Sequence, residues 1–543
     1  MKNIINWKLL LAIVFIAAFL RTYALGTNPP SMHIDEADAV YGANSILQTL
    51  CDQYGNFLPI QFQNNHRSPL YVYSVIPSVG IFGMSPFAAR FPSAVFGVLT
   101  VVIFFFLVKK LFNNNNLALL ATFLIAINPW SIQISRTGVE EAFALFLVIF
   151  GVTLILYTDK KKLYFLPISG LILGLSLFSY HAPKIFLVVF LPVLFFYRKD
   201  LIKSKMFIFF IIIFGLFLAF SAKLTIFDGI AKFNDTSIFN SIKAGDRVDV
   251  ERHLTTAPLW ASSLFHSKPL YYLKTFETTY VGIFSINYLF INGESNQDKG
   301  TSRHGQFYLF ELPFFFIGLY WLFRKNKKVF LLLLSWMFMG AIPGGLTNTG
   351  YLSYRDVLFL PVPIIFSSLG ILYLFSEIRK ISKKYSIMFL ISFISICFIL
   401  IASYLFTYFL DYPVYSSDWW QMPQRQAMEY ANENQNKYDK IFVNGGEDWA
   451  LLYAFYNNID PRDFQKAYKN KERIDETMVI NFGRFYFGGF NQEKFAENEL
   501  NSIKSLYMGF EKIFPNKKLI YNIYSPDGVN VVVRIFESNE QDN

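Results

Sequence analysis

Long apolar runs separated by short polar segments dominate the first 410 residues of this chain. An α-helix needs about 20 apolar residues to cross the ~30 Å hydrocarbon layer of a bilayer, and several of the runs reach that length. The runs lie near residues 7–25, 88–109, 116–134, 138–157, 163–181, 183–198, 206–223, 307–323, 329–346, 355–375 and 385–409. The pattern predicts a multi-pass α-helical membrane body of about 11 transmembrane helices over residues 1–410. A further apolar stretch, 70–84, fits an interfacial or re-entrant helix as well as a span.

The pattern changes after residue 410, where the apolar runs stop and charged residues become frequent. Periodicity and turn signals predict one helix over 422–434 and strands over 440–444, 477–490, 519–524 and 531–536. The last two strands flank Ser525-Pro526-Asp527-Gly528, a turn sequence, so we expect them to pair as a hairpin. Residues 411–543 are long enough for a small α/β domain. They contain no metal-ligand spacing and no phosphate-binding loop.

Basic residues mark alternate connections between the runs. They occur at 109–110, 160–162, 198–205, 324–328 and 379–384. Short loops rich in Lys and Arg face the cytoplasm, so the N-terminus, with Lys2 and Lys8, is predicted to be cytoplasmic. The first outer loop (26–87), the second long outer loop (224–306) and the domain at 411–543 are then extracytoplasmic. The first run lacks a small-residue cleavage site and is expected to be a retained helix.

Composition agrees with a cell-membrane protein. The 543 residues are 53% hydrophobic and include 62 Phe, which excludes a soluble protein of ordinary composition. The net charge of +10 could indicate nucleic-acid binding, but much of it lies in the short loops, so we discard that interpretation. Cys51 and Cys397 are the only cysteines, so no disulfide framework is expected.

A cluster of acids follows the first run directly. Asp35, Glu36 and Asp38 lie within four residues, next to His33. Ionisable groups near a bilayer are costly unless they face water, a partner or a substrate. The alternative is helix capping, because Asp35 or Glu36 could begin a helix over 37–50, but a cap needs one acid rather than three.

Other ionisable residues recur at the same predicted membrane face. They are His66, Arg67, Arg90, Arg136, Glu140, Glu141, His181, Lys184, Arg303, His304 and Arg355. Each alone fits an interfacial anchor or a helix end. Together they predict one polar site suited to an anionic lipid headgroup.

Several short motifs occur in order along the membrane body. They are Asp35-Glu36-Ala37, Arg67-Ser68-Pro69-Leu70-Tyr71, Arg90-Phe91-Pro92-Ser93-Ala94 with Gly97, Asn128-Pro129-Trp130 followed by Ser135-Arg136, Pro313 with Gly318, and Arg355 with Pro361. In order, spacing and sidedness the chain resembles the polytopic lipid-phosphate-sugar-dependent glycosyltransferases. This superfamily includes the protein O-mannosyltransferases and lipid A aminoarabinose transferase (family 39 type). The resemblance covers residues 7–410 and implies a catalytic first outer loop and a sugar donor carried on polyprenyl phosphate, undecaprenyl or dolichyl.

The chemistry of such a transfer assigns provisional roles. The acceptor hydroxyl or amine needs a base, and the departing phosphate needs cations. Asp35 is the predicted base, also by resemblance, and Glu36 is the second choice. Glu140 or Glu141, near Arg136, is expected to orient the acceptor or Asp35, unless these acids only cap the fourth span. For the donor phosphate the best partners are Arg67 and Arg355, because a guanidinium fork matches phosphate oxygens; Lys184, Arg90 and Arg303 are further candidates. Inversion is expected by resemblance.

Metal dependence is an open alternative. In the aminoarabinose-transferase branch a Glu-Lys-Pro-Pro stretch supplies a metal ligand and a phosphate-binding Lys, whereas this chain has His66-Arg67-Ser68-Pro69. Arg67 keeps the cation, but His66 replaces the acid. His66 and His304 could bind Zn²⁺, and Asp35 or Asp38 could bind Mg²⁺ or Mn²⁺. Separated histidines are more often ordinary polar surface residues, so no cofactor is firmly predicted.

The predicted function is a membrane glycosyltransferase acting at the outer face on a protein, lipid or glycan acceptor, with membrane lipids as its surroundings. An oligosaccharide polymerase or ligase that uses lipid-linked glycans is the first alternative. A lipid or sugar transporter is less favoured, because transporters usually show repeated halves and ionisable residues at mid-membrane.

Overall fold

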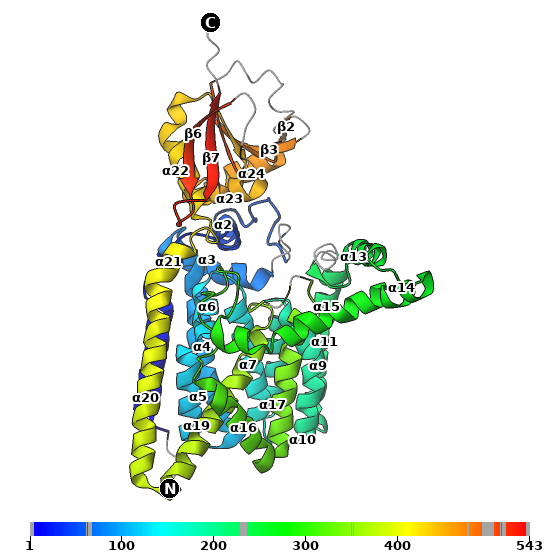
Figure 1. Cartoon of the computed structure of the whole chain (residues 1–543), viewed down its shortest axis with the longest axis vertical. Coiled ribbons are helices and arrows are strands. Elements are labelled where there is room, and N and C mark those ends of the chain that lie inside the picture. Colours follow the sequence, from blue (N-terminus) through cyan, green and yellow to red (C-terminus); the bar gives the residue numbers. More distant parts are fainter. Residues whose placement is uncertain are drawn as a thin grey trace.

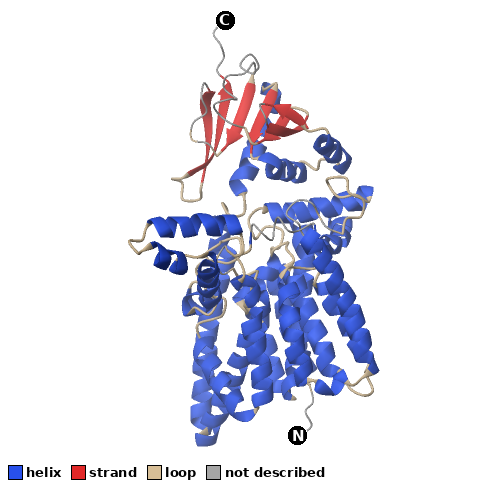
Figure 2. Ribbon diagram, turned by 90° about the vertical axis from the view of Figure 1, so that its right-hand side faces the viewer, coloured by secondary structure: helices blue, strands red, loops and turns tan. Residues whose placement is uncertain are grey.

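A computed structural model of the chain describes residues 5–60, 62, 68–227, 236–348, 350, 352–474, 477–490, 504–510, 512 and 517–538. A long helical bundle forms one end of the molecule and a β-sheet the other, with short helices between them (Figures 1 and 2). The N-terminus lies at the end of the bundle farthest from the sheet (Figure 1).

The bundle contains a helix in each of the eleven predicted runs. Its main helices are α1 (Trp7–Thr22), α4 (Pro86–Phe112), α5 (Asn115–Ile127), α6 (Pro129–Arg136), α7 (Glu141–Tyr157), α8 (Phe165–Ser176), α9 (Ala182–Tyr197), α11 (Lys205–Phe227), α16 (Glu311–Lys325), α17 (Lys327–Gly340), α19 (Pro361–Ile381) and α20 (Lys383–Phe406). In the described part of the chain, five helical segments are long and apolar enough to cross a membrane, or six if α5 and α6, bent by 55°, form one span. The helical body is therefore confirmed, and the count of 11 spans stays a prediction.

Short elements complete the bundle. They are α10 (Lys199–Ile202), η2 (Asn287–Ile291), α18 (Ile342–Gly345), η3 (Val357–Phe359), η4 (Thr407–Asp411) and α21 (Tyr412–Tyr415). The basic connection around α10 lies at the same end as the N-terminus (Figure 1). This placement agrees with the predicted sidedness, while the assignment of that end to the cytoplasm stays a prediction.

Glycine lets two pairs of helices approach closely. A Cβ on Gly318 of α16 would overlap the carbonyl oxygen of Phe366, and one on Gly370 of α19 would overlap that of Phe314. A Cβ on Gly97 of α4 would overlap the Ser135 hydroxyl. Gly318 and Gly97 belong to the sequence motifs, and their role is to permit this packing.

The first outer loop forms two helices, α2 (Ile34–Thr49) and α3 (Pro69–Phe82). The N-cap of α2 is His33, whose Nδ1 accepts a hydrogen bond from the Asp35 backbone N–H at 3.2 Å. The capping alternative for Asp35 and Glu36 is therefore wrong, because both acids lie inside the first turn.

The sheet domain, residues 422–538, contains α22 (Met422–Asn434), η5 (Gln435–Lys437), β1 (Lys440–Asn444), α23 (Gly446–Tyr456), α24 (Pro461–Lys469), β2 (Glu472–Ile474), β3 (Thr477–Phe482), β4 (Phe485–Gly488), β5 (Ser505–Gly509), β6 (Lys517–Tyr524) and β7 (Val531–Ser538). The seven strands have the order β2-β3-β4-β1-β5-β7-β6, with β1 parallel to β4 and β5. The predicted hairpin of β6 and β7 is confirmed. The predicted strand 477–490 is wrong as one element, because Gly483, at φ +63°, turns the chain between antiparallel β3 and β4.

The sheet domain shares a hydrophobic core with the first outer loop. Buried Tyr41 and Ile46 of α2 belong to the same cluster as Trp449 of α23 and Phe464 of α24. The Tyr41 hydroxyl also donates to the Ile459 carbonyl at 2.9 Å. This packing holds α2 between the sheet domain and the bundle (Figure 1).

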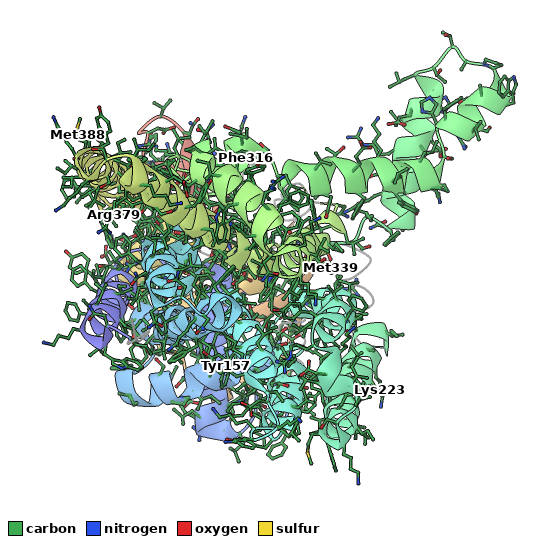
Figure 3. All side chains as sticks on the ribbon, turned by 90° about the horizontal axis from the view of Figure 1, so that it is seen from below. Tyr157, Lys223, Phe316, Met339, Arg379 and Met388 are labelled. Carbon is green, nitrogen blue, oxygen red and sulfur yellow. The ribbon has the colours of Figure 1, made fainter. Side chains whose placement is uncertain are left out.

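The second long outer loop contributes α13 (Ser241–His253), α14 (Leu259–Phe265) and α15 (Lys268–Gly282). These three helices, called the arm below, extend sideways from the bundle (Figures 1 and 3).

Candidate active site

Buried arginines hold the first outer loop in place. Arg90 of α4 forms a two-pronged pair with Glu36, Nε to Oε1 at 2.9 Å and Nη2 to Oε2 at 2.7 Å. Arg90 also donates to the carbonyls of Leu25, Pro29 and Ser31. Both side chains are at most 1% exposed. A buried charge pair of this kind is stable only when its hydrogen bonds are satisfied, which this network achieves.

Arg136 of α6 has a similar structural position. Its guanidinium donates to the carbonyls of Leu20, Tyr23 and Asn28 and lies 5.0 Å from the ring centre of Phe409. Arg136 is fully buried and does not line the cavity described next. The site predicted as one group of ionisable residues is thus divided into a buried layer of arginines and an open cavity.

The cavity lies at the sheet-domain end of the bundle and has a volume of about 430 Å³. Helices α7, α9 and α11, the first residues of α2 and α3, and the segments before α13 and α19 contribute to its wall. The ionisable lining residues are Asp35, Glu140, Glu141, Tyr180, His181, Lys184, Lys299, Tyr354 and Arg355. Much of the remaining wall is apolar, for example Leu177, Phe178 and Leu224. The cavity therefore combines an apolar surface with both signs of charge.

Three carboxylates face this cavity. Asp35 is about one-third exposed, and its Oδ2 lies 3.3 Å from His33 Nδ1. Glu141 is buried, and its Oε2 has no hydrogen-bond partner among the described residues. The Glu140 side chain does not cap α7. The partly exposed Asp35 carboxylate and the buried Glu141 carboxylate thus both lie on the cavity wall, where a reactive or orienting carboxylate is required.

Three cations share the same cavity. Lys184 donates to the Thr225 hydroxyl at 3.2 Å, and Arg355 lies 5.4 Å from the Tyr354 ring centre. Lys299 lies 5.1 Å from the same ring and 3.3 Å from Asp298. Both Lys184 and Arg355 were predicted, whereas Lys299 was not. It lies in a polar segment of the second outer loop with no motif, so the sequence provided no signal for it.

The charge of Lys299 depends on its acidic neighbours. Burial lowers the pKa of Lys299, but the carboxylates of Asp298, Asp35 and Glu141 outweigh burial and raise the pKa above its usual value. Lys299 is therefore a permanent cation close to the predicted base.

The sheet domain adds one acid to this region. Asp448 lies in the first turn of α23, and its carboxylate interacts electrostatically with Asp35 and His33. Partial burial and the neighbouring Asp35 and Glu447 raise the pKa of Asp448. The first outer loop and the sheet domain thus meet beside the cavity.

Comparisons with known proteins were made on sequence and on structure. The family model for dolichyl-phosphate-mannose-protein mannosyltransferase matches residues 66–224. ArnT from Cupriavidus metallidurans, solved with undecaprenyl phosphate, matches with a TM-score of 0.53 and 9% identity over 98% of this chain and 99% of that chain. The predicted resemblance to the polytopic glycosyltransferases is confirmed. At this low identity the ArnT match shows a shared fold along nearly the whole chain, sheet domain included.

Two further glycosyltransferase structures show weaker likeness. The archaeal oligosaccharyltransferase AglB from Archaeoglobus fulgidus, in complex with an inhibitory peptide and a dolichol-phosphate, matches with a TM-score of 0.48 and 15% identity over 83% of this chain. This chain spans 63% of the length of AglB. The S. cerevisiae Pmt1–Pmt2 protein O-mannosyltransferase complex bound to the sugar donor matches with a TM-score of 0.33 and 18% identity, covering 42% of this chain and 34% of that one. The search of curated proteins found no match.

Several predicted site residues of this glycosyltransferase-like body lie away from the cavity. Arg303 pairs with Asp411 at 3.6 Å and lies 4.0 Å from the Tyr415 ring centre. His304 contacts the Ser403 hydroxyl at 3.4 Å. Buried Asp38 accepts a hydrogen bond from Gln53 at 2.6 Å. Neither Arg303, His304 nor Asp38 lines the cavity, because each is held by another part of the fold.

His66 and Arg67 lie outside the described residues, so their predicted roles remain predictions. Within the described ranges, no group of three or more His, Cys, Asp or Glu side chains could hold a metal ion. Asp38 and His304, two of the predicted ligands, contact Gln53 and Ser403 instead. Because His66 lies outside the described residues, the metal alternative stays a prediction, and we assign no step to a metal.

Proposed function

We propose that this protein is an integral-membrane glycosyltransferase that moves a sugar from a polyprenyl-phosphate donor to an acceptor at the extracytoplasmic face. The observation that carries the proposal is the cavity itself, where Asp35 and Glu141 face Lys299, Lys184 and Arg355 within about 430 Å³. Undecaprenyl phosphate and dolichol-phosphate are bound in the solved structures of ArnT and AglB, and either carrier has the required chemistry.

The cationic residues suit the phosphate of the donor. Lys299 and Lys184 provide point charges, and Arg355 provides a planar fork of donors. Negative charge grows on the phosphate as the sugar leaves, so fixed cations stabilise the transition state more than the bound donor. The apolar wall formed by Leu177, Phe178 and Leu224 suits the first units of the polyprenyl chain.

Asp35 is proposed as the base. The acceptor oxygen or nitrogen attacks the anomeric carbon, the bond from that carbon to the phosphate oxygen breaks, and polyprenyl phosphate leaves with the electron pair. The acceptor proton passes to the Asp35 carboxylate. A single displacement inverts the configuration at the anomeric carbon.

Glu36 and Glu141 are proposed to have different supporting roles. Glu36 cannot easily replace Asp35, because Arg90 occupies both of its oxygens and the Gly138 N–H donates to Oε1 at 2.7 Å. We assign Glu36 to positioning α2 and thereby Asp35. Glu141, one of whose oxygens has no hydrogen-bond partner in the described part of the chain, is proposed to orient the acceptor or the Asp35 carboxylate.

Substitution of Asp35 by Asn tests the proposal. Asp35 is not the N-cap, so Asp35→Asn keeps the cap of α2 and loses a first-turn interaction with the helix dipole, about 0.3–1 kcal/mol, together with the charge interactions of Asp35 with His33 and Lys299. Loss of a general base typically lowers the rate by about 10²–10⁴-fold. The purified variant, assayed with a polyprenyl-phosphate sugar and an acceptor, should bind the donor and transfer almost no sugar.

The matched control is Asp463→Asn, which removes an exposed first-turn acid from α24. It should lose the same small helix-dipole term and keep full activity. Wild-type activity of Asp35→Asn would remove Asp35 from the mechanism.

A further inference from the structure

The arm exposes a concentration of large apolar side chains at its tip. Leu254, Leu259 and Trp260 are 82%, 88% and 72% exposed, and Leu264 and Phe265 are 59% and 67% exposed. These five residues fall within twelve positions of the chain. Contiguous exposed apolar surface of this kind marks an interaction site.

Charged residues are most frequent on the first helix of the arm. Helix α13 carries six among its thirteen residues: Lys243, Asp246, Arg247, Asp249, Glu251 and Arg252, although its Ile242 is 75% exposed. Helix α14 carries none, and α15 carries three among its fifteen, beside Leu273 and Val281, which are 60% and 59% exposed. In Figure 1, α13 lies on the sheet-domain side of the arm and α15 on the bundle side. The charge is therefore greatest on the sheet-domain side of the arm, and the exposed apolar side chains are densest at its tip.

The arm is oriented across the bundle. It leaves the sheet-domain end near the top of α11 and runs sideways, beyond the outline of the bundle (Figures 1 and 3). Helix α11 is one of the helices that can cross a membrane, and Phe220 and Ile226, in the half of it nearer the arm, are 41% and 58% exposed. The arm thus joins the bundle next to an exposed apolar helix surface.

We propose that the arm is a membrane-docking element whose tip residues Leu254, Leu259, Trp260, Leu264 and Phe265 enter the lipid leaflet on the sheet-domain side. The charged helix α13 then faces water. Amphipathic helices bind the boundary between headgroups and acyl chains in this orientation, and Trp is favoured at that depth. The occupant is lipid rather than a protein, because the arm leaves the bundle beside the arm-side end of α11, a helix long and apolar enough to cross a membrane.

Docking of the arm would affect the wall of the cavity. Thr236, Ser237 and Phe239, which precede α13, line the cavity. The Ser237 segment also pairs with Thr347, which lines the cavity too. An arm held on the lipid surface therefore keeps this part of the wall next to the membrane, where a lipid-linked molecule arrives. The docking itself does not depend on sugar transfer, so it can be tested separately.

Fluorescent probes at single cysteines test the docking. The full chain, with Cys51→Ser and Cys397→Ser, receives Trp260→Cys or Asp246→Cys, is labelled with NBD, and is placed in nanodiscs at one copy per disc. We expect lipids carrying a nitroxide near the headgroup to quench the probe at 260 at least twofold. Exposed Asp246 lies on the face of α13 opposite buried Ala244 and Val248, so the probe at 246 should be quenched little.

A second probe position, Leu264→Cys, guards against a local failure of the first, and size-exclusion chromatography verifies that each variant is folded and monodisperse. Equal quenching at 246, 260 and 264 would overturn the proposal. A second outcome would also overturn it: protection of the probes at 260 and 264 from a water-soluble quencher only in discs that contain two copies. The tip would then bind a second copy of the chain rather than lipid.

Discussion

Removal of the Lys299 charge should affect stability and catalysis by separable amounts. Lys299→Gln leaves Asp298 without its partner at 3.3 Å, with the two side chains only 15% and 10% exposed. Breaking a fully buried pair costs about 3–5 kcal/mol, so about 2 kcal/mol is expected for this slightly exposed pair. Loss of one fixed charge that stabilises a developing anion lowers kcat by about 10²–10³-fold.

A second substitution separates the two effects. Asp298→Asn in the Lys299→Gln background removes the unpaired acid and should recover most of the stability. It should not recover the rate, because no cation is restored near the donor phosphate. Thermal unfolding in detergent measures the first quantity, and transfer from a purified polyprenyl-phosphate sugar measures the second.

The pH dependence adds a further constraint. The pKa of Lys299 is raised in the folded protein, so its stabilising contribution is fully present below the unfolded-state pKa of about 10.4 and is lost only as pH rises through the folded value. Buried Glu141, which interacts with Lys299, can itself titrate, so the comparison is made in a Glu141→Gln background. In that background the stability difference between Lys299 and Lys299→Gln should be constant from about pH 6 to 9.

The matched control is Lys440→Gln, which removes a lysine that lies 5.2 Å from the ring centre of Tyr486, far from the cavity lining. It should keep normal kcat. The reasoning about Lys299 fails if Lys299→Gln transfers sugar at the wild-type rate, or if the double variant regains both stability and rate.

Three other outcomes are expected. Asp448→Asn should raise the acceptor KM several-fold with little change in the donor KM, because Asp448 lies beside Asp35 on the sheet-domain side; equal changes in both constants would argue against an acceptor-side role. Arg90→Met should destabilise the protein by about 3–5 kcal/mol in thermal unfolding, because buried Glu36 loses its partner. An unchanged Tm would contradict the role of Arg90 in holding the first outer loop. A reporter active only in the cytoplasm should be silent when fused after Asn543, and a signal there would reverse the predicted sidedness.

Local sequence pattern was sufficient to predict the helices of the membrane body. Apolar runs specify helices in a membrane because every backbone polar group must be satisfied within the segment. For this reason the eleven runs each contain a helix, and α22 and β1 have the predicted bounds. The elements of the sheet domain were predicted less completely. Helices α23 and α24 and strand β5 were not predicted, and Gly483 splits one expected strand into β3 and β4. A reversal at a single glycine leaves almost no trace in a pattern of alternating residues.

Only part of the candidate site could be predicted from the sequence. Asp35, Glu140, Glu141, Lys184 and Arg355 were predicted and do line one cavity. Composition could not separate them from Glu36, Arg90 and Arg136, which are the same residue types at the same membrane face. What separates the two groups is burial and pairing, and these depend on segments far apart in the chain, such as the 54 positions between Glu36 and Arg90.

The sequence by itself determined the helical membrane body, the sheet domain and the family resemblance, because hydrophobic periodicity and ordered motifs are local properties. Only the tertiary structure decided that Lys299 joins the cavity, that α2 shares a core with the sheet domain, and that Asp448 lies beside Asp35. Each of these contacts joins segments hundreds of residues apart. Their energies arise from burial and from charges brought together, which no local pattern along the chain encodes.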